Sequence, residues 1–417
     1  LAGIRLGAGL MQRARLSGGD RLEPLSWQGP GHGTEQTKGP AGLTLLWHDP
    51  CRDALCDLDA ALSQHAALLR AHAEDGAGHV ALGIRAWKRP ALRQIFGRFG
   101  PVSFARDPAR ALDLARRTGR PLLVWGDRAL PDRPGVTVRR VEDGFLRSRG
   151  LGADLVPPLS LIADDLGLPH DPTRESRLER LIGAPLPPGA RARVAALVAR
   201  LIREDVSKYN LCAPLPDMPQ DGRLRLLVPG QVADDAALRL GAGPVTDITG
   251  LLRAARAAHP DALIVYKPHP DVEAGLRPGT ILPDPGLADV VARGAHPLRL
   301  IAACDAVWTL TSLLGFEALL RGKPVTCLGL PFYAGWGLTT DLCPAPARRR
   351  GGADLLQMVH AALIAYPRYI DPVSGLPCPP EVVLDRLAQG AGDRRGPGLR
   401  LLARAQRHLA RNRWLWR

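Results

Sequence analysis

The chain has 417 residues, of which 46% are hydrophobic and only 5% aromatic, and its formal net charge is +14. This length suits two packed domains rather than one core, and the recurring apolar runs exclude low-complexity disorder. No stretch reaches the roughly 18 apolar residues that a membrane span needs, and no signal peptide is evident. The seven cysteines include no CxxC pair, so the sequence indicates neither a zinc site nor a disulfide framework.

The excess of positive charge, carried mostly by arginine, predicts an acidic partner such as nucleic acid, an anionic membrane surface or a phosphorylated substrate. A GC-rich genome, which favours arginine over lysine, is the alternative explanation. Nucleic acid would explain the charge but not the motifs, because no nucleic-acid-binding module appears and aromatics are few. We therefore expect no nucleic-acid partner. The chain starts with Leu rather than Met, which suggests part of a longer protein or a processed product.

Strand-like and helix-like runs alternate along most of the chain. Apolar strands are expected at 79–84, 121–126 and 136–144, and helices at 51–73 and 190–204. Strands that alternate with helices of about 10 to 15 residues predict an α/β fold of two Rossmann-like domains with parallel sheets, facing a cleft. The predicted parts are 1–75 (linker and N-terminal helix), 76–220 (first domain), 221–390 (second domain, after a polar boundary at 215–223) and 391–417 (basic tail).

Two adjacent carboxylates, Glu142 and Asp143, stand where the strand at 136–144 opens into a loop. Neighbouring side chains at the end of a strand diverge, so one carboxylate can face the cleft while the other supports it. Paired carboxylates serve glycosyl chemistry, one as acid or base and the other as nucleophile or base. Gly144 allows a turn or a close approach to a ligand. The same tripeptide is also common in surface turns, so the motif alone leaves both interpretations open.

His269 follows an apolar strand in the segment YKPHPD, where prolines on both sides restrict its backbone. Together with Lys267 it would form a phosphate clamp, and Pro270 fixes its direction. An ordinary loop histidine is the alternative, because His-Pro occurs twice more in the chain, at His259 and His296. Its position directly after the strand ALIVY favours the functional interpretation, since ligands of α/β folds bind beyond the carboxyl ends of strands.

Hydroxyl groups stand between a strand and a helix in the segment TLTSLLGFEALLRGKPV. Thr311 or Ser312 can cap that helix, whose first N–H groups would form an anion site, and Glu317 could bind a ribose hydroxyl. Plain capping is the alternative. The loop VPGQVADD adds Gln231, which could hydrogen-bond a sugar or a nucleobase, or could close a polar turn. The polar motifs all follow strands, which is the internal reason to predict an enzyme.

The C-terminal tail is strongly basic. Residues 394–417 contain eight arginines and no acidic residue, and the chain closes on Trp414 and Trp416. Leu399, Leu402 and Leu409 fall near one face of a helix. This composition is typical of an interfacial helix that binds anionic lipid. A solvated tail is the alternative.

Together these motifs resemble the KpsC-type capsule polysaccharide β-Kdo transferases, over residues 80–390. The acidic, His-Pro and Ser/Thr motifs of this chain resemble those of bacterial sialyl- and Kdo transferases that use CMP-activated sugars on a GT-B fold. Family members commonly carry two modules in tandem, whereas this chain has room for one, which resembles the C-terminal module more. The matching segments are VEDGFLRSRGLGADLVPPLSLIADDLG, DPTRESRLE, SKYN, LVPGQVADDAALR, YKPHPDVEAG, TSLLGFEALLRGKPVTCLGLPFYAGWGLT and YPRYIDPVSG.

The resemblance implies retaining transfer of Kdo from CMP-β-Kdo to a Kdo-bearing lyso-phosphatidylglycerol at the cytoplasmic face of the inner membrane. Partners would be this anionic glycolipid, the membrane surface and a capsule assembly or export complex. The acceptor would lie on the 76–220 side and the CMP-sugar on the 221–390 side. No cofactor is implied, and the lack of a metal-ligand cluster in the sequence predicts metal-independent activity. Two alternatives are another CMP-sugar transferase of the sialyl type and a non-catalytic assembly or export component.

The resemblance also assigns roles. Asp143 would attack the anomeric carbon and Glu142 would assist as acid or base, although in the inverting sialyltransferases the corresponding Asp is a base. The carboxylate of Kdo needs a cation, for which Arg147 and Arg149 are the candidates. The expected donor-binding residues are Lys267, His269, Pro270, Thr311, Ser312, Glu317 and Gln231.

Overall fold

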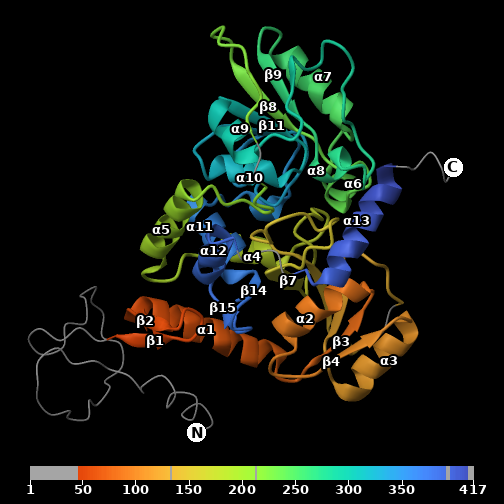
Figure 1. Ribbon diagram of the computed structural model, residues 1–417, viewed down its shortest axis with the longest axis vertical. Coiled ribbons are helices and arrows are strands. Elements are labelled where there is room, and N and C mark those ends of the chain that lie inside the picture. The colour runs from red at the N-terminus through yellow and green to blue at the C-terminus, as the bar shows by residue number, and fades with distance from the viewer. Residues whose placement is uncertain (1–45, 132–133, 212–213, 391–394, 412–417) are drawn as a thin grey trace, which may run out of the picture.

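The computed structural model describes residues 46–131, 134–211, 214–390 and 395–411. Strands β8, β9 and β11 of one sheet lie at the top of Figure 1, and β3 and β4 of the other lie at the bottom. The described chain starts with an antiparallel hairpin of β1 (Trp47–Asp49) and β2 (Ala54–Cys56), then α1 (Leu58–Asp75). This helix starts later than predicted because Asp57 caps it, accepting a hydrogen bond from Ala60 N at 2.8 Å.

The first sheet has seven strands in the order β15-β14-β7-β6-β5-β3-β4. The neighbours among β3 to β6 are parallel, whereas β6 and β7 run antiparallel. The prediction of an all-parallel sheet was therefore wrong for this half, because the chain after β6 turns back as a strand instead of entering a helix. The strands are β3 (His79–Leu82), β4 (Val102–Ala105), β5 (Leu122–Trp125), β6 (Val138–Asp143), β7 (Ser160–Asp164), β14 (Arg368–Ile370) and β15 (Pro377–Cys378).

The second sheet is parallel throughout, in the order β10-β9-β8-β11-β12-β13. The chain moves outward from β8 to β10 on one side and from β11 to β13 on the other, so the strand order reverses between β8 and β11. Ligands of open α/β sheets bind at such a reversal. The strands are β8 (Arg225–Pro229), β9 (Leu263–Lys267), β10 (Val290–Val291), β11 (Ala306–Thr309), β12 (Val325–Cys327) and β13 (Thr340–Asp341).

Helices cover both sheets and fill the space between them (Figure 1). Apolar residues of the first sheet pack on both of its faces, and the largest cluster runs from α4 and α5 to the second sheet, so the two domains share a core. The helices up to β13 are α2 (Arg89–Phe96), α3 (Pro108–Thr118), α4 (Arg177–Gly183), α5 (Ala190–Arg203), α6 (Ala236–Gly241), α7 (Ile248–Ala258), α8 (Pro270–Glu273), α9 (Pro297–Ala303) and α10 (Leu313–Leu319).

After the second sheet the chain returns to the first. Helix α11 (Leu355–Val359) and a π-helical turn (His360–Ala365) lead to β14, which pairs antiparallel with β7, and α12 (Pro380–Ala388) follows β15. The predicted second domain, 221–390, therefore ends too late, because β14 and β15 complete the first sheet. Helix α13 (Pro397–Arg411) lies within the predicted basic tail. Within the described ranges, no helix is both long and apolar enough to cross a membrane.

Candidate active site

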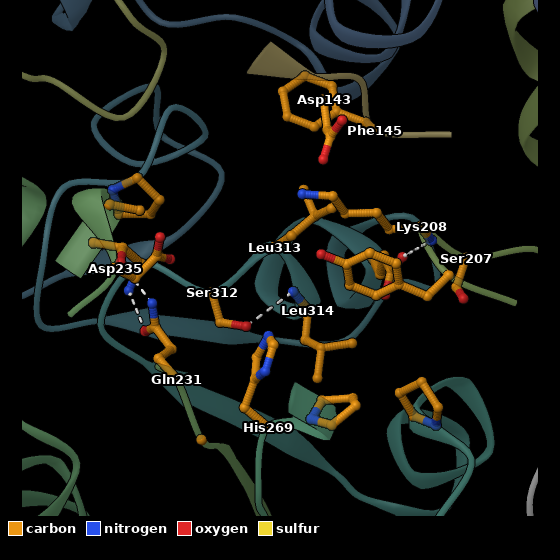
Figure 2. A pocket seen from close by; sticks show the side chains of 18 of the residues that line it. Asp143, Phe145, Ser207, Lys208, Gln231, Asp235, His269, Ser312, Leu313 and Leu314 are labelled. Carbon is orange, nitrogen blue, oxygen red and sulfur yellow. Dashed lines mark hydrogen bonds between the residues drawn. The ribbon is translucent and has the colours of Figure 1, made fainter. Parts of the chain in front are cut away.

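A cavity of about 500 Å³ opens where the two domains face each other. The end of β6, the loops after β8, β9 and β11, and the segment around Lys208 line it. In Figure 2, Asp143 and Phe145 enter from one side, His269 and Ser312 lie opposite, and Lys208 lies between them. The structure thus brings together residues that were predicted from separate motifs, although their ligands stay predictions. Those lining the cavity are Glu142, Asp143, Gln231, Lys267, His269, Pro270, Thr311, Ser312 and Glu317.

Asp143 is the last residue of β6, and two cations hold its carboxylate. Arg147 Nε lies 2.8 Å and Lys88 Nζ lies 3.6 Å from Asp143 Oδ2. Burial alone would raise the pKa of this carboxyl, but Arg147, Lys88 and Lys208 together hold that pKa well below its usual range. The other oxygen, Oδ1, is buried and has no hydrogen-bond partner in the described part of the chain. Asp143 is therefore ionised at neutral pH and has one oxygen available to a ligand.

Glu142 has the opposite electrostatic character. Burial, reinforced by the negative charge of Asp143, raises the pKa of Glu142 to about 7, although Lys88 and Lys208 oppose this shift. A carboxyl that titrates near neutral pH can accept and donate a proton, whereas its ionised neighbour suits attack on carbon or stabilisation of positive charge. The two adjacent carboxyls are thus suited to different chemical tasks by their surroundings.

Gly144 is needed for packing against the neighbouring strand. Gly144 N donates a hydrogen bond to Ser160 O at 3.1 Å, and a Cβ atom on Gly144 would lie 2.2 Å from Ser160 Oγ. The sequence suggested a turn or a close contact with a ligand. The structure instead shows that any side chain here would push β6 and β7 apart, next to Asp143.

Neither arginine that was predicted to hold the sugar carboxylate lines the cavity. Arg147 is fully buried and pairs with Asp143, while its Nη1 donates a hydrogen bond to Ser148 Oγ at 2.7 Å. Arg149 is exposed. The role of both arginines toward the sugar carboxylate stays a prediction. The structure shows that Arg147 lowers the pKa of Asp143.

Lys208, in the segment SKYN, is a cation that does line the cavity, and no role was predicted for it. Burial would lower the pKa of its ammonium, but Tyr209 and Asp143 together raise it, so Lys208 stays charged. The backbone fixes its place, since Lys208 N donates a hydrogen bond to Glu317 Oε1 at 3.0 Å. A single lysine in a connecting segment has no spacing pattern, so only the match of SKYN to the family could have drawn attention to it.

Gln231 and Thr311 connect the loops after β8 and β11, at the reversal of strand order. Gln231 Nε2 donates to Thr311 Oγ1 at 2.8 Å, and Thr311 N donates to Gln231 Oε1 at 3.0 Å. Both groups of the Gln231 amide are thus used inside the protein. Glu317 Oε1 likewise accepts a hydrogen bond within the protein, from Lys208 N. Burial raises the pKa of Glu317 to about 7. We conclude that Gln231 shapes the cavity by holding these two loops together.

His269 lines the cavity as a neutral imidazole. Its Nδ1 accepts a hydrogen bond from Asp271 N at 3.1 Å, so the ring proton belongs on Nε2, which can donate. Burial, with the positive charges of Lys208, Lys267 and Arg277, lowers the pKa of His269 to about 3. The predicted phosphate clamp therefore has a hydrogen-bond donor here and not a second cation.

The other two members of the predicted anion site are already engaged. Lys267 Nζ lies 2.7 Å from Glu273 Oε2, so its charge is compensated within the protein. Ser312 Oγ accepts a hydrogen bond from Leu314 N at 3.3 Å and thereby caps α10. Because α10 spans only Leu313–Leu319, its dipole is a weak source of positive potential. The positive field in the cavity therefore rests on Lys208 more than on the helix.

In the described residues, no group of three or more histidine, cysteine, aspartate or glutamate side chains could hold a metal ion. Metal-independent activity stays a prediction.

Two Rossmann-like domains whose loops meet at one cleft define a GT-B-like fold. Residues 187–369 match the family described as capsule polysaccharide biosynthesis protein. The capsule polysaccharide modification protein LipA of Neisseria meningitidis serogroup A is 41% identical over 305 residues, which are 70% of this chain and 42% of LipA. The lipopolysaccharide-processing protein LpsZ of Rhizobium meliloti is 38% identical over 69% of either chain. The chain belongs to this family of capsule polysaccharide proteins, and it spans less than half of the length of LipA.

Solved structures of KpsC from Thermosulfurimonas dismutans are similar to most of this chain. The β-Kdo 2,7 transferase is 33% identical with a TM-score of 0.63, covering 75% of this chain and 99% of that one. The β-Kdo 2,4 transferase is 32% identical with a TM-score of 0.64, covering 74% and 97%. The predicted KpsC-type resemblance and GT-B-like fold are confirmed. The two matches are nearly equal, so they do not indicate a linkage, and the closer likeness to a C-terminal module stays a prediction.

Proposed function

We propose that this protein is a glycosyltransferase that moves Kdo from CMP-β-Kdo to a Kdo-bearing lyso-phosphatidylglycerol, with retention of configuration. One observation carries the proposal: Asp143, held ionised, and Glu142, with its pKa near 7, line the same cavity. Membership of the capsule polysaccharide family and the likeness to two structures named as β-Kdo transferases support the class of sugar.

In the first step, Asp143 Oδ1 attacks the anomeric carbon of Kdo and forms an ester bond to it. The bond between that carbon and the phosphate oxygen breaks, and its electron pair leaves with CMP. Arg147 and Lys88 support this role because they keep the carboxylate charged while leaving Oδ1 without a hydrogen bond.

In the second step, a hydroxyl of the acceptor attacks the same carbon, the ester bond breaks, and Asp143 regains its charge. Glu142 takes the proton of that hydroxyl. Once Asp143 is esterified, its negative charge no longer raises the pKa of Glu142, so Glu142 is ionised at neutral pH and can accept this proton. Each step inverts the carbon, so two steps restore the original configuration.

The anionic groups of the donor lie on the opposite wall of the cavity. His269 donates from Nε2 to the phosphate of CMP, next to Ser312, and Lys208 supplies the positive charge for the phosphate or for the carboxylate of Kdo. Lys208 suits this task better than Lys267, whose charge Glu273 already compensates. No cofactor or metal takes part.

The acceptor is an anionic glycolipid, so the protein works as a peripheral protein at the cytoplasmic surface of the inner membrane, with a capsule assembly or export complex as a further partner. The net charge of +14 complements both the lipid and the donor. Nucleic acid is not a partner.

The proposal is tested with CMP-Kdo generated in situ and a synthetic Kdo-terminated acceptor, with product followed by mass spectrometry. Wild type should form product, whereas Asp143→Ala and His269→Ala should lose at least about 100-fold in rate. Asp59→Ala and His72→Ala, exposed on α1, are the matched controls and should retain full activity. No product with wild type would favour a non-catalytic assembly component, and equal activity in all variants would reject the site.

Two further measurements refine the reaction. With Glu142→Gln the second step slows, so a Kdo adduct should accumulate on Asp143; an active variant without an adduct would instead make Asp143 a base. CMP-sialic acid should compete poorly with CMP-Kdo, and good competition would point to the sialyl type. Turnover should be unchanged by EDTA.

A further inference from the structure

Helix α13 carries two leucines that the described part of the chain leaves uncovered. Leu401 is 69% exposed and Leu402 is 54% exposed, whereas Ala403 is only 3% exposed and marks the line where the helix contacts the protein. The start of the helix is tethered, since Arg395 Nη1 donates a hydrogen bond to Asp154 O at 3.0 Å. In Figure 1, α13 runs along the edge of the molecule between α6 and α2. An amphipathic helix placed at an edge with two leucines in water lacks a partner for its apolar side.

Basic residues occupy another side of the same helix. In the sequence, Arg400 and Arg404 stand four positions apart, so the helix brings them to one side, next to Leu401 and away from Leu402. Arg400 and Arg404 are exposed. No acidic residue occurs from 394 to 417. This charge selects an anionic occupant, and the two exposed leucines beside it select one with an apolar interior.

We propose that α13 lies in the headgroup region of an anionic bilayer, with Leu401 and Leu402 inserted between lipid chains and Arg400 and Arg404 bound to lipid phosphates. A bilayer surface offers anionic phosphates and apolar chains next to each other, and it does not require the helix to dock in one fixed position. The helix lies outside the cavity, so the inference does not depend on which sugar, if any, the cavity transfers.

Vesicle flotation with the full chain, without donor or acceptor, tests the proposal. The protein should float with vesicles made of phosphatidylcholine and phosphatidylglycerol in equal parts, and should stay in solution with phosphatidylcholine alone. High salt should weaken binding, because screening reduces the attraction between arginine and phosphate. The double variants Leu401→Ser/Leu402→Ser and Arg400→Gln/Arg404→Gln should each lower the apparent affinity about tenfold or more.

Matched control variants distinguish binding through α13 from non-specific binding of other exposed leucines and arginines to vesicles. Leu282, also 69% exposed, is changed to Ser, and Arg203→Gln/Arg253→Gln removes two exposed arginines from other helices. Both controls should bind like wild type. Failure of wild type to bind the mixed vesicles, or equal binding by the α13 variants, would overturn the proposal. So would a dimer of wild type, seen by light scattering, that dissociates in Leu401→Ser/Leu402→Ser, because a second copy would then cover the helix.

Discussion

Asp143 and Arg147 are coupled as a buried pair, and the arginine decides what the carboxylate can do. Burial pushes the pKa of Asp143 upward, and the nearest opposing charge is the guanidinium 2.8 Å away. Lys88 lies farther away, at 3.6 Å, and lowers the pKa of Asp143 less than Arg147 does. Identity alone would give Glu142 and Asp143 similar pKa values; burial raises that of Glu142, whereas Arg147, with help from Lys88 and Lys208, lowers that of Asp143.

Replacement of Arg147 by Met should therefore raise the pKa of Asp143 and protonate part of the nucleophile. We expect the acid limb of the kcat/KM profile to move toward neutral pH and the rate at neutral pH to fall about tenfold or more. Arg147→Lys keeps a positive charge and should recover part of the loss. The control is Arg149→Met, on the exposed arginine outside the cavity, which should leave the profile unchanged. An unshifted acid limb in Arg147→Met would contradict this account.

Glu142 should impose a second pH dependence. Its folded pKa lies near 7, above the usual value, so it binds a proton at low pH and becomes a base as the pH rises through 7. If it accepts the proton of the acceptor, kcat should rise with pH and level off, with a midpoint below about 7, because the ester on Asp143 removes the charge that helps to raise this pKa. In Glu142→Gln, kcat should drop by about 10² to 10⁴ and this rise should vanish. If kcat of Glu142→Gln, measured with a saturating acceptor, still rose with pH in the same way, the pH dependence would belong to another group.

At the scale of elements, the contact between β6 and β7 sets the position of the acidic pair. Gly144→Ala would place a methyl group 2.2 Å from Ser160 Oγ, so the strands must separate. We expect a loss of about 1 to 3 kcal/mol in the free energy of unfolding, measured by urea denaturation, together with lower kcat. Ser160→Gly makes room and should restore part of both in the double variant. If the double variant were no better than G144A, the clash would not be the cause.

The sequence predicts the elements of the second sheet well, because β8, β9 and β11 are short apolar runs, each followed by a Pro, Gly or Ser/Thr loop. It predicts the first sheet less well. Strand β7 turns back from β6, and β14 pairs with β7 across the whole second domain, because a strand's partner is set by tertiary packing and not by local periodicity.

The sequence likewise predicts only some of the residues of the candidate site. Motifs at strand ends predicted Asp143 and His269 as cavity residues, because the fold class alone brings such ends together. The effects of Arg147 and Lys208 on the pKa of Asp143 could not be predicted, since only the folded loops bring these two charges near that carboxylate.

At the scale of the molecule, two contacts fasten the domains to each other. In the first, Phe145, which follows β6, stacks on Phe332 with ring centroids 4.8 Å apart. In the second, Glu179 of α4 is 3% exposed and accepts from Arg349 Nε at 2.5 Å and from Arg348 Nε at 2.7 Å. These arginines follow β13, so the pair joins the end of the second sheet to the first domain. A buried carboxylate that compensates two arginines is costly to remove.

Glu179→Gln should weaken this connection without changing the shape of the side chain. Glutamine preserves the capping box with Ser176 but leaves Arg349, which is 1% exposed, without its counter-charge. We expect a loss of about 3 kcal/mol in the free energy of unfolding. Glu175→Gln, which removes an exposed partner of Arg180, should cost less than about 1 kcal/mol. Adding Arg349→Met to Glu179→Gln removes the stranded charge and should recover stability in a double-mutant cycle. Additive losses in that cycle would mean that the two residues do not act as a pair in holding the domains together.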